Sequence, residues 1–170
     1  MERVSDYELG TPGLYDLVVS QERALVLSTF TRDDAWALGT RMREAARARS
    51  LPVVIGIVVG AQRVFHAALE GSSADNDAWL ERKTRAAVHY SRSSLGVGEQ
   101  FRRRGWTFEA DSRLDPREIA GNGGVFPITV KGVGVVGAVG VSGLPQLEDH
   151  DFVVEMLQAH MEATATASDI

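Results

Sequence analysis

The amino-acid sequence predicts an α/β (α+β) fold, in which helices pack on the faces of a largely antiparallel sheet of about five strands. Two observations support this prediction. Short apolar runs of strand length alternate along the chain with segments whose apolar residues recur every three or four positions. Tight turns rather than long crossovers join neighbouring strands, which is typical of antiparallel pairing. With 170 residues we expect a single domain, ordered over about 12–161 and looser at 1–11 and 162–170.

Composition excludes several classes of protein. The chain has 18 basic and 23 acidic side chains and no basic stripe, so nucleic acid is not an expected partner. The absence of cysteine excludes disulfides, thiolate metal sites and a cysteine nucleophile, and it fits a reducing compartment. No apolar run approaches the ~20 residues of a membrane span, and the acidic first residues lack the apolar core of a signal peptide. We therefore expect a cytoplasmic protein with no membrane partner.

The first half of the chain predicts two helices and three strands. Pro12 suits the first position of a helix, because that position needs no N–H donor. Thr31 and Asp34 have the spacing of a capping box, which opens the second helix. Gly39 inside this helix indicates close packing against a neighbour, since glycine costs about 1 kcal/mol there relative to alanine. The expected elements are a helix at 12–21, a strand at 24–30, a helix at 31–50 and hairpin strands at 53–59 and 63–69.

The second half predicts a long helical stretch, a second hairpin and a last helix. A polar cluster at 71–77 precedes a helix that we expect to begin at Ala78. A basic helical segment then ends at Gly105, as expected for a glycine C-cap. After Pro145, acidic residues in a first turn and an apolar face behind them predict the last helix. The other expected ranges are helices at 78–93 and 97–104, a short turn at 115–121, and strands at 125–130 and 133–142.

The second hairpin belongs to a segment that is rich in glycine, since residues 121–143 hold eight of the chain's 17 glycines. A two-residue turn at Lys131 and Gly132 would pair Phe126 with Gly137 and leave one bulky and one small-residue face. Pro127 would direct its missing N–H away from the partner strand, which places strand 125–130 at a sheet edge. We call the small-residue face the glycine floor; it comprises Val125, Pro127, Thr129, Gly134, Val136, Ala138, Gly140 and Ser142.

Five motifs follow one another along the chain. They are DDAWALG at 33–39, GSSADNDAWLERK at 71–83, GGVFPI at 123–128, GVVGAVGVSGLP at 134–145 and EDH at 148–150. Together they resemble the haem-degrading-domain (GlcG/HbpS-like) family, and most closely its branch numbered 303 among the uncharacterised protein families, over roughly residues 14–160. The resemblance implies a profilin-like layered fold and assembly into a homo-oligomer, as a dimer or a larger ring. It also implies haem as a possible cofactor, because some members of the wider family bind or break down haem.

Candidate ligand-binding residues occur in these motifs. Asn76, Trp79 and Lys83 lie about one turn apart on one helix face, and a lysine at that place could bind a carboxylate or phosphate. The alternative is that Trp79 belongs to the core and that Lys83 extends over it to solvent. Gly123 and Gly124 could form a nest of N–H groups for an anion, although a plain tight connection is the simpler interpretation.

Ser142 on the glycine floor and His150 at the start of the last helix complete the candidate set. His150 is the possible haem ligand, and the alternative is a solvated residue of the first helical turn. Ser142, His150 and Asp149 are residue types of a catalytic triad, but Ser142 lies in no nucleophile elbow, so catalytic residues stay unknown. No two histidines have a convincing metal-ligand spacing, and no firm metal site is predicted.

Two functions are compatible with this sequence. The first is a small-molecule-binding protein whose site lies between the glycine floor, the helix of Asn76 and Lys83, and the start of the last helix, with haem or a small carboxylate as the ligand. The second is a non-catalytic protein whose small-residue face seats helices closely and whose function is homo-oligomeric assembly or partner binding. An enzyme is a third choice, because the chain lacks a complete set of nucleophile, base and oxyanion donor.

Overall fold

The computed structural model describes residues 1–168 and confirms the predicted α+β fold. Within these residues, five strands form one open sheet in the order β1-β4-β5-β2-β3. The strands are β1 (Val26–Leu27), β2 (Val54–Val59), β3 (Gln62–Ala68), β4 (Val125–Val130) and β5 (Gly134–Ser142). The helices are a 3-10 turn η1 (Val4–Asp6), α1 (Pro12–Ala24), α2 (Arg32–Ala48), α3 (Ala74–Tyr90), α4 (Ser94–Arg102), α5 (Phe108–Asp111) and α6 (Gln146–Ser168). The sheet is largely antiparallel, and only the pairing of β1 with β4 is parallel.

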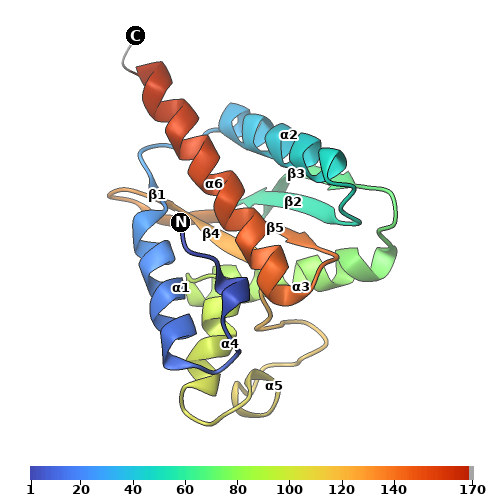
Figure 1. The fold of residues 1–170 in the computed structure, drawn as a ribbon, viewed down its shortest axis with the longest axis vertical. Coiled ribbons are helices and arrows are strands. Elements are labelled where there is room, and N and C mark those ends of the chain that lie inside the picture. The colour runs from blue at the N-terminus through green and yellow to red at the C-terminus, as the bar shows by residue number, and fades with distance from the viewer. Residues whose placement is uncertain (169–170) are drawn as a thin grey trace.

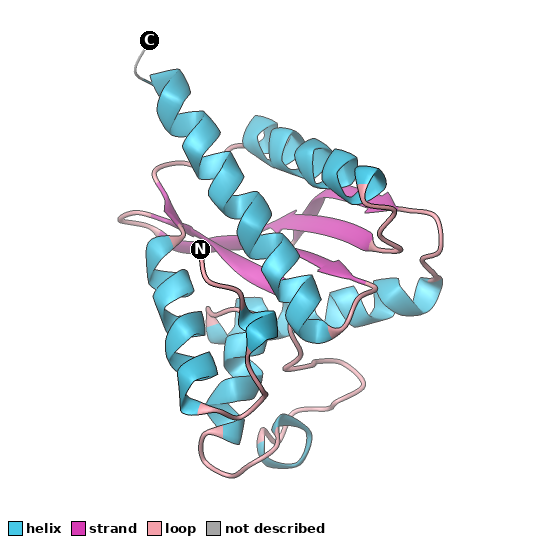
Figure 2. Ribbon diagram, viewed as in Figure 1, coloured by secondary structure: helices cyan, strands magenta, loops and turns pink. Residues whose placement is uncertain are grey.

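Helices cover both faces of the sheet (Figures 1 and 2). α2 and α6 lie on one face, where Leu38 and Phe152 contribute to the main hydrophobic core. α3 covers the opposite face, with Leu80 packed against the sheet. α1, α4 and α5 lie at one end of the sheet and bury smaller apolar clusters around α4. Among the residues described, no helix is long and apolar enough to cross a membrane.

α2 begins at the predicted cap. The Thr31 hydroxyl accepts the N–H of Asp34 at 3.1 Å, and the Asp34 carboxylate accepts the N–H of Thr31 at 2.7 Å. Gly39 lies under the ring of Phe65 in β3, and a Cβ at this glycine would come within 2.4 Å of that ring. The predicted capping box and the predicted close approach at Gly39 are therefore both confirmed.

The register predicted for the hairpin of β4 and β5 is wrong. Phe126 pairs with Val139 rather than with Gly137, and an irregularity after Ile128 leaves Val136 as an extra residue on β5. The connection differs from the predicted two-residue turn because Gly132 and Gly134 both take positive φ values, +76° and +104°. At this irregularity Val136 packs on the main core instead of on the glycine floor.

The predicted edge position of strand 125–130 is also wrong, because β1 pairs with its last two residues. The predicted strand at 24–30 is in fact only two residues long, so it leaves the start of β4 uncovered. There the Ser94 hydroxyl accepts the N–H of Val125 at 3.0 Å and donates to its carbonyl at 3.3 Å. Pro127 lies between these two partners, and its missing N–H therefore breaks no strand pairing.

The N-terminal segment, which composition predicts to be loose, is docked on α6. Val4 is buried, and the carboxylate of Asp151 accepts the N–H groups of Val4 at 2.7 Å and Ser5 at 3.1 Å. At the other end, α6 continues to Ser168, beyond the expected end of the ordered core at 161. The last two residues of the tail that was expected to be loose, 169–170, lie outside the described residues.

Candidate functional site

Most of the glycine floor is covered by α3. Leu80 and Ala87 of this helix pack on Val125 and Ala138 of the sheet. The part left open is a cavity of about 280 Å³ at the end of β5, between the first turns of α3, the loop before β4 and the start of α6. Its lining residues are Asp75, Asn76, Trp79, Lys83, Asn122, Gly123, Ser142, Gly143, Leu144, Gln146 and Asp149.

The structure brings five of the seven predicted site residues to this cavity. Asn76, Trp79 and Lys83 come from α3, Gly123 from the loop before β4, and Ser142 from the end of β5. α3 begins at Ala74, four positions before the predicted start, and the side-chain oxygen of Asn76 accepts the N–H of Ser73 at 2.8 Å. Asn76 therefore lies in the first turn of α3, where it can face the cavity while its side chain caps the N-terminus of the helix.

The buried ammonium of Lys83 links the loop before β4, the end of β5 and the start of α6 through three hydrogen bonds, and we call this arrangement the Lys83 clamp. The Lys83 side chain is 97% buried, and its ammonium donates to the carbonyls of Gly123 at 3.0 Å and Val141 at 2.9 Å and to the Asp149 carboxylate at 3.0 Å. Burial lowers the pKa of Lys83 and raises the pKa of Asp149, and the attraction between the two groups opposes both shifts. Three acceptors require three N–H donors, so we take Lys83 as charged. Lys83 thus binds a carboxylate of the protein itself and does not extend to solvent.

Trp79 is only half-buried, in contrast to its alternative interpretation as a core residue. The guanidinium carbon of Arg82 lies 3.9 Å from the centre of the Trp79 ring, which fixes the indole by a cation–π contact. The indole also lines the cavity, so it combines a supported aromatic surface with an N–H donor that has no protein partner among residues 1–168. It can therefore contribute both packing and a hydrogen bond to a ligand.

The loop before β4 packs closely against the Lys83 amine and the start of α6. A Cβ at Gly124, whose φ is +127°, would lie 2.5 Å from the Lys83 amine, and one at Gly123 would lie 2.3 Å from the carbonyl of Gln146. The carbonyl of Gly123 points to the ammonium, and its N–H is bound by the Gln146 side chain at 3.1 Å. These two glycines therefore cradle a cation of the chain and the start of α6, and the N–H of Gly123 is not free for an anion.

Ser142 is a buried residue whose hydroxyl opens into the cavity. The residue is 4% exposed, and within residues 1–168 its hydroxyl has no hydrogen-bond partner. Sequence reasoning missed Asn122 and Gln146, which line the same cavity. Asn122 lies inside the GNGG segment and Gln146 directly before EDH, so their positions beside two motifs were the available signal.

His150 lies outside the cavity, and its interpretation as a solvated residue is wrong. It is 1% exposed, packs 5.7 Å from the Phe126 ring between ring centres, and bonds through Nε2 to the Gln21 side-chain oxygen at 2.9 Å. Burial lowers the pKa of His150 to about 4. Within the described chain, Ser142 has no bond to His150 and no catalytic triad forms. Gly124 contacts the Lys83 clamp but does not line the cavity.

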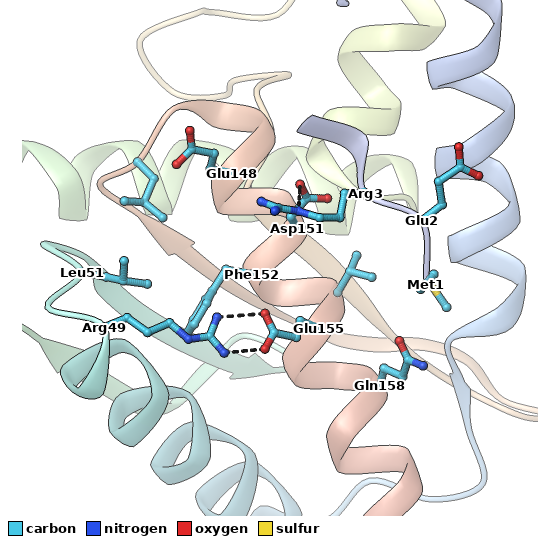
Figure 3. A pocket seen from close by; sticks show the side chains of 12 residues that line it. Met1, Glu2, Arg3, Arg49, Leu51, Glu148, Asp151, Phe152, Glu155 and Gln158 are labelled. Carbon is cyan, nitrogen blue, oxygen red and sulfur yellow. Dashed lines mark hydrogen bonds and ion pairs between the residues drawn. The ribbon is translucent and has the colours of Figure 1, made fainter. Parts of the chain in front are cut away.

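A second cavity, of about 390 Å³, lies between the N-terminal residues, the end of α2 and α6 (Figure 3). Its two guanidinium groups are paired with carboxylates of α6, Arg49 with Glu155 at 2.9 Å and Arg3 with Asp151 at 3.4 Å. The buried residues of its lining, Phe152 and Val154, are apolar. Within residues 1–168, no cluster of three or more His, Cys, Asp or Glu side chains could hold a metal ion. The cavity at Ser142 is therefore the stronger candidate site.

Comparisons with known proteins agree with this architecture. A family model described as "Haem degrading protein HbpS-like" matches residues 30–158. A UPF0303 protein of Streptomyces avermitilis is 54% identical over 154 residues, which cover 91% of this chain and 94% of that protein. The crystal structure of Ybr137w protein matches with a TM-score of 0.79 at 31% identity, over 87% of this chain and 89% of that one. The crystal structure of a PduOC:heme complex matches in fold, with a TM-score of 0.61 at 18% identity over 78% of this chain and 94% of that one.

Proposed function

Since this chain belongs to the HbpS-like family of haem-degrading proteins, we propose that it is a small-molecule-binding protein whose ligand occupies the cavity at Ser142. The observation that carries this proposal is Ser142, a residue that is 4% exposed, lines the cavity and has a hydroxyl without a protein partner within the described residues. A hydroxyl both donates and accepts hydrogen bonds, so Ser142 can bind a polar group of a ligand. A ligand, or water in its absence, is the partner that this hydroxyl can reach.

The size of the cavity limits the ligand. A volume of about 280 Å³ has room for on the order of ten water molecules. This is near the lower end of the usual range for small-molecule sites, about 300–1,000 Å³. A metabolite of roughly ten non-hydrogen atoms therefore suits the cavity better than a large cofactor.

The residues around this cavity do not fit a haem group. Haem iron is held by His, Cys, Met or Tyr, and no lining residue is of these types. His150, the haem ligand suggested by the sequence, is bonded to Gln21 and packed on Phe126 in the interior. It could meet an iron only if α6 separated from both neighbours. For haem, the family relationship is thus the only support.

Ligand screening by thermal unfolding tests the proposal. A compound present at 100 times its Kd stabilises the folded protein by about 2.7 kcal/mol and raises the Tm by several degrees. We expect small polar metabolites to do so in wild type and less in Ser142→Ala. The matched control is Ser20→Ala, because Ser20 is exposed on α1 far from the cavity lining. A broad screen of small polar metabolites and haemin that yields no saturable, Ser142-dependent stabilisation would contradict the function.

Assembly into a homo-oligomer is a second proposal, favoured by exposed apolar side chains. Trp36 on α2 is 67% exposed and Val133 in the β4–β5 turn is 72% exposed. Single exposed apolar residues are common. Exposure of a tryptophan to water is unfavourable because its apolar surface is large, and an interface would bury that surface. Light scattering on the purified chain should give a multiple of 18.4 kDa, and Trp36→Ser should lower that mass. A monomer mass in wild type would exclude assembly.

A further inference from the structure

The cavity at Ser142 is lined by both hydrogen-bond donors and hydrogen-bond acceptors that have no protein partner within the described residues. Among residues 1–168, Asn122 has no partner for either end of its amide, and the amide nitrogens of Asn76 and Gln146 are also free. With the hydroxyl of Ser142, the lining therefore offers several donors together with acceptors from Asn122 and the Asp75 carboxylate. A hydroxyl group both donates and accepts hydrogen bonds, whereas a carboxylate only accepts. The set is thus better matched by several hydroxyls than by a carboxylate.

The charge of the lining points in the same direction. Lys83 is the only cationic side chain in it, and all three of its donors are used by Gly123, Val141 and Asp149. The carboxylate of Asp75 has no cationic partner within the described chain, so the lining carries an unbalanced negative charge. The N-terminus of α6 could attract an anion, but the carboxylate of Glu148 in its first turn offsets that field. A full negative charge on the ligand would therefore meet repulsion that no unpaired cation of the lining compensates.

Trp79 adds an apolar surface to these polar groups. Its indole lines the cavity and is held by the Arg82 guanidinium. A sugar or cyclic polyol presents C–H groups beside its hydroxyls, so it can pack on an aromatic ring while its hydroxyls bond to amide side chains. A small inorganic anion would leave this surface unused.

From these three features we infer that the ligand is a neutral, hydroxyl-rich molecule of about monosaccharide size, and that organic anions are selected against. This inference rests on the proposed function, because it names the ligand class for the same cavity. Ser142 and Asn122 supply hydrogen bonds, Trp79 supplies packing, and Asp75 supplies the discrimination by charge.

Matched pairs of compounds that differ in one carboxylate test the inference. The probes are D-glucose with D-glucuronate and D-galactose with D-galacturonate, titrated against the full-length protein by calorimetry and ligand-observed NMR. We expect at least one neutral member to bind at least tenfold more tightly than its acid, a difference of about 1.4 kcal/mol. Ser142→Ala should weaken that binding about tenfold, while Ser20→Ala should leave it unchanged.

A second variant tests the effect of the charge of the lining without disturbing the fold. Asp75 is exposed, so Asp75→Asn should leave the fold intact, and we expect it to narrow the ratio of neutral to acidic affinity severalfold. An acid that binds more tightly than its neutral partner, in a Ser142-dependent manner, would overturn the inferred ligand class and leave the proposed function standing. If neither member of either pair binds, the inference is overturned, and the metabolite screen then decides separately whether the cavity binds any small molecule.

Discussion

At the scale of single residues, the decisive side chain is Lys83, one of only two lysines in the chain. Sequence spacing placed it correctly beside Asn76 and Trp79, but it could not reveal that the chain supplies the carboxylate. Asp149 lies 66 positions away, and only the fold brings it within 3.0 Å. Three acceptors converge on one point, which suits the compact ammonium of lysine better than a planar guanidinium.

We expect Lys83→Met to lower the free energy of unfolding by about 3–5 kcal/mol, because it leaves the buried carboxylate of Asp149 without its cation. Urea denaturation of the purified variant measures this loss. The matched control is Lys131→Met, since Lys131 is exposed in the β4–β5 turn and should change stability by no more than about 0.5 kcal/mol. Adding Asp149→Asn to Lys83→Met should restore part of the loss. Equal effects of the two lysine variants would show that the clamp contributes nothing.

At the scale of elements, the sequence predicts features that depend on neighbouring residues, but not features that depend on residues far apart in the chain. The start of α2 depends on Thr31 and Asp34, three positions apart, and the sequence predicts it correctly. The register of β4 and β5 depends on two positive φ values and an extra residue at Val136, which no pattern of apolar residues specifies. The function of Gly124 was equally hidden, because the group that approaches it comes from α3.

Substitution of glycines in this hairpin region should separate backbone strain from crowding. Gly124 and Gly132 both have positive φ, which costs an alanine about 1–3 kcal/mol. Only at Gly124 would the new Cβ also meet the Lys83 amine and the Val141 carbonyl, whereas nothing lies within 4 Å at Gly132. We therefore expect Gly124→Ala to lower the Tm clearly more than Gly132→Ala. The reverse order in a calorimetric scan would contradict the clamp geometry.

The backbone N–H groups of the docked N-terminal segment are bound by one carboxylate of α6. Asp151→Ala removes the acceptor for the N–H groups of Val4 and Ser5, so we expect faster amide exchange at residues 4–7 and a loss of about 1–2 kcal/mol. Asp151→Asn keeps one side-chain oxygen and should show a smaller effect. Hydrogen exchange measured by NMR distinguishes the two variants, and unchanged protection in Asp151→Ala would contradict the docking.

At the scale of the whole molecule, α6 joins two separate parts of the fold. Adjacent residues on a helix point about 100° apart, so Asp149 reaches α3 and the cavity while His150 reaches α1 and the core. The sequence predicts the helix and its acidic start. It also leads us to expect that all three residues of EDH, 148–150, lie beside the same site. The rotation of α6, set by packing on Phe126 and the sheet, divides the motif between the cavity and the interior.

This burial of His150 makes global stability depend on pH. The pKa of His150 falls from 6.5 to about 4 because burial disfavours the charged ring, while Asp151 opposes the shift. The unfolded chain therefore takes up a proton below pH 6.5 and the folded chain only near pH 4. The stability associated with neutral His150 is complete above pH 6.5 and is lost as the pH falls toward 4. A shift of 6.5 − 4 = 2.5 units corresponds to about 3 kcal/mol.

Denaturation measured between pH 7 and pH 4 in wild type and His150→Gln tests this assignment. Glutamine has a neutral side chain at every pH, so the variant should lose less stability on acidification and its curve should converge with that of wild type near pH 4. His160, whose pKa is also lowered by burial, contributes in the same direction in both proteins and cancels in the comparison. His89→Gln, at an exposed position on α3, is the control for the substitution itself. Parallel curves for wild type and His150→Gln would show that His150 does not remain neutral in the folded protein, and α6 would then need a different contact with α1.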